Sequence, residues 1–202
     1  GIDELIRRQP YVQDVRAYNM GEAVHRNLND FRARLFQSLR VGQGKDKHLT
    51  HWMCDAHGVP HSVLLEQWLT ITDPIEAAPV VFSRAGAGRP PHQVYHNELF
   101  PWYRVCEKYR GKAVFVGTPL EHTVFCAAFG DFPHCKTATL LDAARVIAGA
   151  KLFVGNQTAT HAIAEGLKKD IVLEVWRDGP NCIVHRPGVW HGWDGNVNLP
   201  EI

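Results

Sequence analysis

Hydrophobic positions along the chain follow one spacing before about residue 72 and another after it. From residue 79 onward, short apolar runs of the kind that form buried strands alternate with longer stretches that have helical spacing. Repeated strand–helix units predict a parallel sheet with flanking helices, which is a Rossmann-like α/β fold. The expected strands are 79–84, 112–117, 151–155 and 171–175, and the expected helices are 99–109, 119–129, 139–150 and 158–169.

The first 72 residues are polar, rich in histidine and less regular. A connector at 68–79 contains two prolines, which break regular structure. We therefore expect two parts: a short, incomplete α/β N-terminal region at 1–72 and a Rossmann-like domain with a C-terminal tail at 73–202. Within the first part, the patterns predict helices at 3–8, 29–39 and 48–57 and a strand at 11–18.

Composition narrows the class of protein. The 202 residues are 45% hydrophobic and 21% charged, with a formal net charge of +1, so nothing in the overall charge indicates nucleic acid as a partner. No run of about 20 apolar residues predicts a membrane span, and no signal peptide is visible. The five cysteines are odd in number and lack a CxxC pair, which favours free thiols in a cytoplasmic setting.

Polar or small residues follow three of the predicted strands, and in a parallel sheet such ends meet at one edge. An arginine beside a glycine-rich loop suits a diphosphate, because its planar fork binds two oxygens at once. Backbone N–H groups at the start of helix 158–169 could hold a phosphate oxygen, and Glu174 could accept hydrogen bonds from ribose hydroxyls. The alternative is that the arginine pairs with a surface carboxylate and the glycines only permit tight turns. The candidates are Ser83, Arg84, Gly117, Glu121, His122, Gly155, Asn156, Gln157, Thr158 and Glu174.

No P-loop or dinucleotide fingerprint occurs. Instead, segments 115–122, 148–158 and 162–166 resemble the C-terminal half of GT-B glycosyltransferases, closest in character to the family 9 heptosyltransferases. The resemblance covers about residues 79–185. It implies a nucleotide-sugar donor, inverting transfer to an acceptor that the sequence does not identify, and no cofactor or obligatory metal.

The resemblance also assigns residues. Asn156, Gln157 and Thr158 match the donor-contacting turn, His161 matches the histidine of the following helix, and Arg84 matches the basic group after the first strand. The chain departs from the family because Gln157 replaces a common acidic residue. A full acceptor domain with its catalytic carboxylate is also not recognisable. No catalytic residue is therefore assigned, and a partner chain could complete the N-terminal half.

Two functions from different classes follow. The first is a glycosyltransferase of GT-B type, and the second is a non-catalytic binding or assembly module derived from the same fold. A further alternative is an epimerase-like enzyme with this fold, which would bind the nucleotide but release free sugar.

A second cluster, at 48–61, contains several potential metal ligands. A zinc site there would use His48, His51, Cys54 and His57. The alternative is a helix with polar histidines outside, and we favour it because the chain has 12 histidines and no recognised zinc spacing. Near the C-terminus, Trp190 and Trp193 could stack on a sugar or base, but we expect a tail that folds back over the core.

Overall fold

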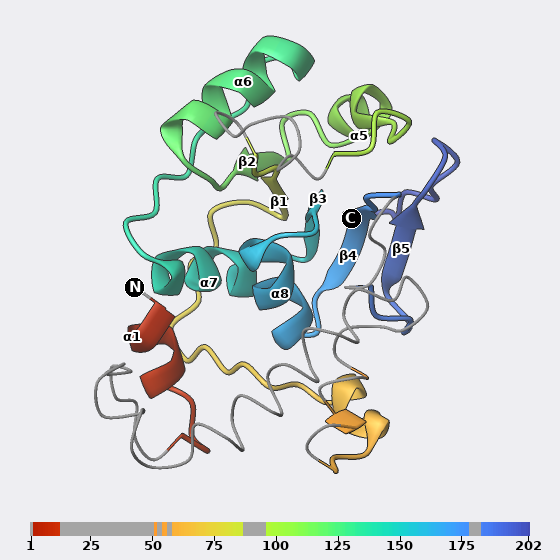
Figure 1. Cartoon of the computed structure of the whole chain (residues 1–202). Helices are drawn as coiled ribbons and strands as arrows, with labels where there is room; N and C mark the ends of the chain where they lie inside the picture. Colours follow the sequence, from red (N-terminus) through yellow and green to blue (C-terminus); the bar gives the residue numbers. More distant parts are fainter. Residues whose placement is uncertain (1, 13–50, 52–53, 56–57, 87–95, 178–182) are drawn as a thin grey trace, which may run out of the picture.

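The computed structural model describes residues 2–12, 51, 54–55, 58–86, 96–177 and 183–202, and these form a three-layer α/β fold (Figure 1). The central sheet has five strands in the order β2-β1-β3-β4-β5, and every pair is parallel. The predicted Rossmann-like α/β class is confirmed. The strands are β1 (Val80–Ser83), β2 (Ala113–Phe115), β3 (Leu152–Asn156), β4 (Asp170–Glu174) and β5 (Val189–Gly192).

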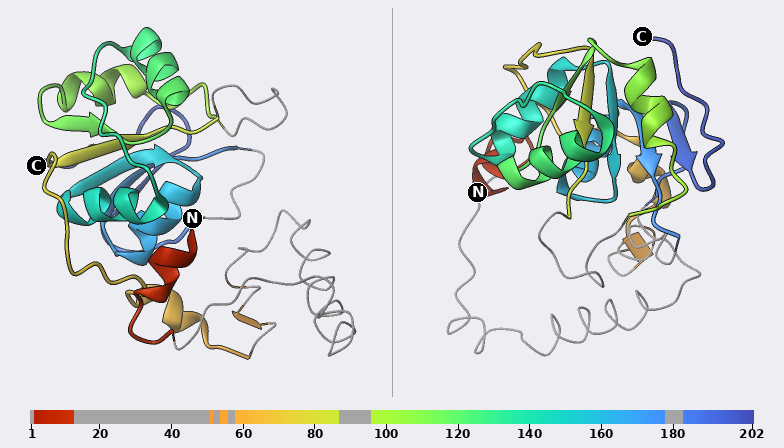
Figure 2. Two further views of the ribbon diagram at one scale, coloured as in Figure 1. Left: turned by 90° about the vertical axis from the view of Figure 1, so that its left-hand side faces the viewer. Right: turned by 90° about the horizontal axis from the view of Figure 1, so that it is seen from above.

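Helices cover both faces of this sheet (Figure 2). Alternate strand residues point to opposite faces, so Val80 and Phe82 belong to one apolar core and Val81 to the other. Helices α5 (Trp102–Lys108) and α6 (Pro119–Phe129) bury one face, and α7 (Leu140–Gly149) and α8 (Ala159–Gly166) bury the other. Burial on both sides explains why the strands read as continuous apolar runs.

The predicted helices on this sheet are present. α7 and α8 start one residue later than predicted, α8 ends at Gly166 rather than at residue 169, and the largest shift of a start is in α5. α6 has the predicted bounds, whereas α5 begins at Trp102 rather than at residue 99. Asn97 accounts for the delay, because its side-chain oxygen accepts the Leu99 N–H at 3.0 Å and forms a turn ahead of the helix. Pro101 then occupies the N-cap position.

The N-terminal segment packs on the same core. The predicted helix at 3–8 is present as α1 (Ile2–Arg7), whose Leu5 is 2% exposed within the core that α7 and α8 form with the sheet. The Gln9 side chain bonds to both backbone groups of Thr70, and Trp68 N donates to Gly166 O. Residues 2–12 and 66–71 thus pack against the sheet domain. A short 3₁₀ helix, η1 (His61–Leu65), precedes the connector. The connector at 68–79 contains neither helix nor strand, as predicted.

Several expectations lie outside the described residues. The predicted helix at 29–39 and most of the predicted strand at 11–18 fall there, while residues 51, 54 and 55 of the predicted helix at 48–57 are helical. The described residues include no helix long and apolar enough to cross a membrane. The cysteines within the described ranges, Cys54, Cys106, Cys126 and Cys135, are free thiols.

The C-terminal region differs from the prediction. Residues 189–192 do not fold back as a tail but form β5, which pairs in parallel with β4. The chain doubles back only afterwards, where Val197 and Leu199 pack on the α5 side and Tyr109 donates a hydrogen bond to Pro200 O. The four residues of β5, Val-Trp-His-Gly, are too few to reveal a strand by alternation alone.

Candidate functional site

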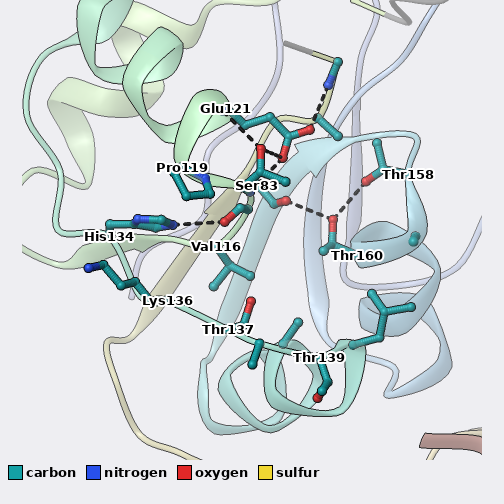
Figure 3. Close-up of a pocket in the computed structure, with 18 of the residues that line it drawn as sticks. Ser83, Val116, Pro119, Glu121, His134, Lys136, Thr137, Thr139, Thr158 and Thr160 are labelled. Carbon is teal, nitrogen blue, oxygen red and sulfur yellow. Dashed lines mark hydrogen bonds between the residues drawn. The ribbon is translucent and has the colours of Figure 1, made fainter. Parts of the chain in front are cut away.

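A cavity of about 670 Å³ opens at the carboxyl ends of β1, β2 and β3 (Figure 3). The chain leaves β1 toward β2 on one side and returns to β3 on the other, so the cavity lies where the strand order reverses. Open parallel sheets bind ligands at this position. The cavity is lined by Ser83, Ala85, Gly86, Val116, Gly117, Thr118, Pro119, Glu121, His134, Lys136, Thr137, Ala138, Thr139, Leu140, Ala143, Gln157, Thr158, Ala159 and Thr160.

Three helices begin at this cavity, and their first turns differ. Thr118 and Glu121 form a capping box at the start of α6, and Thr139 and Asp142 form another at the start of α7. In both, a carboxylate lies against the positive end of the helix dipole. Thr158, the N-cap residue of α8, makes no side-chain bond to its helix backbone. The start of α8 therefore keeps its capacity to attract an anion.

The hydroxyl of Thr158 instead joins a chain of hydroxyl groups that lines the cavity. Thr160 Oγ1 lies 2.9 Å from Thr158 Oγ1 and 2.9 Å from Ser83 Oγ (Figure 3). Each hydroxyl has one proton to donate and can rotate to suit a ligand. The chain spans from the end of β1 to the first turn of α8, where Thr158 Oγ1 also donates to Asn156 O at 3.3 Å. A hydroxyl that rotates out of this chain can donate to a phosphate oxygen instead.

Asn156 and Gly155 hold the two central strand ends close together. The Asn156 side chain donates to Ala85 O at 3.0 Å and accepts from Ala85 N at 3.1 Å. A Cβ atom on Gly155 would lie 2.4 Å from Ser83 O, so only glycine fits there. Asn156 is 1% exposed and holds the Ala85 backbone beside the cavity, while its predicted contact with a ligand stays a prediction.

Glu121 and Gly117 lie in the cavity wall, as the sequence placed them at a strand end. Glu121 Oε2 accepts from Thr118 N and Thr118 Oγ1, both at 2.9 Å, and Oε1 accepts from Gly86 N at 3.1 Å. The carboxylate thus ties the start of α6 to the loop after β1. A Cβ on Gly117 would lie 2.7 Å from the Phe115 ring and 3.1 Å from Glu121 Oε2.

Arg84 and Glu174 bind each other and do not line the cavity. Arg84 Nε and Nη2 each donate to a Glu174 carboxylate oxygen at 2.9 Å, and the Glu174 side chain is 0% exposed. The guanidinium also lies over the rings of Trp102 and Phe129, at 5.8 and 5.6 Å. In this structure the two side chains form a buried ion pair, whereas the alternative raised for Arg84 was a pair with a surface carboxylate. The expected contacts with a diphosphate and a ribose stay predictions.

His122 is also directed away from the cavity. Its Nε2 lies 2.8 Å from Phe132 O, and its ring stacks on His134 at 4.4 Å. His134 does line the cavity, with Nε2 2.9 Å from Gly117 O, and exposed Lys136 lies at the rim below it in Figure 3. The sequence reasoning missed both residues. Their signal is the polar stretch 134–139, which leads directly into the capped start of α7.

The remaining candidates have mixed positions. Gln157 lines the cavity, with its Oε1 accepting from Trp176 N at 2.7 Å, while His161 is buried within α8.

Of the weak metal candidates, His48 and His57 lie outside the described residues. His51 stacks on His61 at 4.4 Å, and His61 bonds to Asp55. Within the described ranges, no three His, Cys, Asp or Glu side chains are placed to hold a metal ion.

Comparison with known proteins adds one likeness. No protein-family model matches the chain, and no curated protein sequence matches it. Among solved structures, the chain resembles the crystal structure of the glycosyl transferase family 9 from Veillonella parvula DSM 2008, with a TM-score of 0.46 and 14% sequence identity. The match covers 74% of this chain and 50% of that chain, so this chain matches about half of that protein.

Proposed function

We propose that the cavity binds the nucleoside diphosphate portion of a nucleotide sugar, and that the protein acts in transfer of the sugar to an acceptor. The observation that carries this proposal is the uncapped start of α8, which opens into a cavity of about 670 Å³ at the reversal of strand order. The backbone N–H groups at a helix start and the helix dipole favour an anion there. The volume lies within the range of small-molecule sites.

The neutral donors around α8 suit a leaving diphosphate. Ser83, Thr158 and Thr160 offer hydroxyl groups along one wall. Negative charge grows on the diphosphate as the bond to the sugar breaks, and fixed dipoles that meet this charge lower the barrier. The choice of a sugar as the transferred group rests on the resemblance of segments 115–122 and 148–158 to GT-B glycosyltransferases.

A second function, binding without catalysis, is supported by the hydrogen bonds of the carboxylate in the cavity. Glu121 is the carboxylate among the described lining residues. It already accepts three hydrogen bonds that hold the start of α6 and the loop after β1, which makes it a poor candidate for a catalytic base. Sugar transfer needs a group that takes the proton of the acceptor hydroxyl. The described part of the chain therefore fits a binding module as well as a donor-binding half.

Calorimetric titration with UDP, GDP, ADP and CMP tests the binding step. Thr158→Asp should weaken binding at least about tenfold, because the new carboxylate opposes the phosphate at close range. The unfolding midpoint should not fall, since aspartate is as good an N-cap residue as threonine. Thr123→Asp is the control. It adds the same charge at an exposed position of α6 that does not line the cavity, and this variant should bind nucleotides like the wild type.

The outcomes separate the alternatives. If the wild type binds none of these nucleotides, the proposal is wrong. If a nucleotide binds but the matching nucleotide sugars are neither hydrolysed nor transferred to any sugar acceptor, the binding module is favoured over the transferase.

A further inference from the structure

A second cavity, of about 570 Å³, lies at the carboxyl end of β4, and two of its lining residues are hydrogen-bonded to residues that line the first. Trp176 lines it and donates its backbone N–H to Gln157, which lines the first cavity. His96 likewise lines it and bonds to the carbonyl of Ala85, another residue of the first cavity. Ligands in the two cavities would therefore lie side by side.

The second cavity has a rigid base, which is built around Asn97. This residue is 3% exposed, and its backbone N–H donates to the buried Glu174 at 2.7 Å. Its side-chain amide donates to Gly192 O and Trp193 O at 3.3 and 2.9 Å, and its side-chain oxygen fixes the Leu99 backbone. Walls that are ordered before binding reduce the entropy lost when a ligand binds.

The side chains above this base combine a cation, an acid and apolar surface. Arg177 is exposed, and no carboxylate in the described ranges forms an ion pair with it. Arginine binds phosphate and carboxylate groups through two parallel hydrogen bonds. Leu99 and Trp176 supply apolar walls, and the exposed Glu98 can accept hydrogen bonds from hydroxyl groups.

We propose that this second cavity binds a ring-bearing anion, a sugar phosphate or a sugar carboxylate, beside the nucleotide. Arg177 would pair with the anionic group, while Glu98 would accept from ring hydroxyls. Burial and the neighbouring Arg84 lower the pKa of His96, so at neutral pH the cation available to the ligand is Arg177. The expectation of a sugar ring, rather than another polar ring, rests on the proposed function.

Calorimetric titrations of the whole chain with glucose 6-phosphate, glucuronate and glucose test this site. The wild type should bind one or both anions and bind glucose at least about tenfold more weakly, because glucose lacks the charged group. Arg177→Gln should weaken binding of the anion by a similar factor and leave binding of the nucleoside diphosphate unchanged. Lys151→Gln is the matched control, because it removes a positive charge from the exposed opposite end of β3.

Thr158→Asp completes the design, because it should lose the nucleotide and keep the sugar anion. If Thr158→Asp loses the sugar anion and Arg177→Gln keeps it, the anion binds in the first cavity and the inference is wrong. If the wild type binds a nucleotide but neither anionic sugar, the inference also fails while the proposed function stands. The relative affinities of glucose 6-phosphate and glucuronate identify which anionic group the site takes.

Discussion

Glu174 is fully buried at the carboxyl end of β4 and accepts four hydrogen bonds from three other segments. Two come from Arg84 after β1, one from the backbone of Asn97 and one from Trp102 Nε1 on α5 at 2.8 Å. A buried carboxylate is tolerated when its charge is paired and its lone pairs are satisfied. This one side chain therefore orients the loop beside the first cavity and the base of the second.

Replacing Glu174 with Gln should lower the free energy of unfolding by about 3 kcal/mol, because it leaves the Arg84 charge without its partner in a buried place. The new amide would also direct an N–H toward the donors around it. Urea denaturation measures the change. Glu201→Gln removes a carboxylate that is 91% exposed and should leave the urea midpoint unchanged. Equal midpoints for the two variants would contradict the structural role of Glu174.

At the scale of residues, sequence reasoning found the right strand ends but could not find the partners. Arg84 and Glu174 are 90 positions apart, so their pairing depends on which strands lie on either side of β3. No pattern around Asn156 indicates that its side chain would bond to the Ala85 backbone. His134 and Lys136 were missed because they lie in the loop between α6 and α7, whereas the candidates were chosen at the ends of predicted strands.

At the scale of elements, the start of α7 illustrates how a capping box responds to pH. The Thr139 hydroxyl donates to Asp142 at 3.0 Å, and this bond is the main reason that the pKa of Asp142 lies below its usual value. A carboxyl group whose pKa is lower in the folded state stabilises the fold above its unfolded pKa of about 3.9. That stabilisation is lost as the pH falls through the folded pKa.

Asp142→Asn should therefore reduce stability by about 1 kcal/mol at pH 7, and the difference from wild type should shrink as the pH falls below about 4. Urea unfolding curves between pH 7 and pH 2.5 measure this. Thr139→Val removes this donor and also the N-cap acceptor of the Asp142 N–H, so it should show the same pH-dependent difference on top of a loss that does not change with pH. A difference that stays constant over the whole range would mean that the ionised carboxylate does not act through the cap.

The elements themselves were largely predictable. Strands β1 to β4 are mostly apolar and mostly buried, and two helices begin with a Thr that has an acid three positions later, so both types of element leave clear patterns. β5 left none, because Val189–Gly192 mixes Trp and His with one aliphatic residue and is only half-buried. β5 pairs with the edge of β4 that no other strand occupies, and this edge exists only once the sheet has assembled.

At the scale of the whole molecule, α1 and the sheet share one core. Leu5 packs within the cluster that includes Ile147, Ile163 and Ile171 from α7, α8 and β4. Asp73 adds a polar link, since it pairs with both Arg8 and Arg145 at 3.3 and 2.6 Å. The described parts of the N-terminal region and the sheet should therefore unfold together.

Leu5→Ala should lower the free energy of unfolding by about 3 kcal/mol, because it leaves a cavity in the shared core. Thermal and urea unfolding should still show a single transition. Ile2→Ala, in the same helix but at a position that is 58% exposed, is the control and should have little effect. A separate early transition, or equal effects of the two variants, would show that α1 is not part of the same cooperative unit.

The stretch that follows α6 serves two purposes at once. β2 is an outer strand of the sheet, and residues 133–135 cover its free edge: Phe115 N donates to Pro133 O at 2.8 Å and Cys135 N to Phe115 O at 2.9 Å. An uncovered edge invites pairing with other chains. The next few residues form a wall of the first cavity. Shortening this stretch to admit a larger ligand would therefore uncover the edge of β2 and promote aggregation. A redesign that enlarges the cavity should instead change residues on the α8 side.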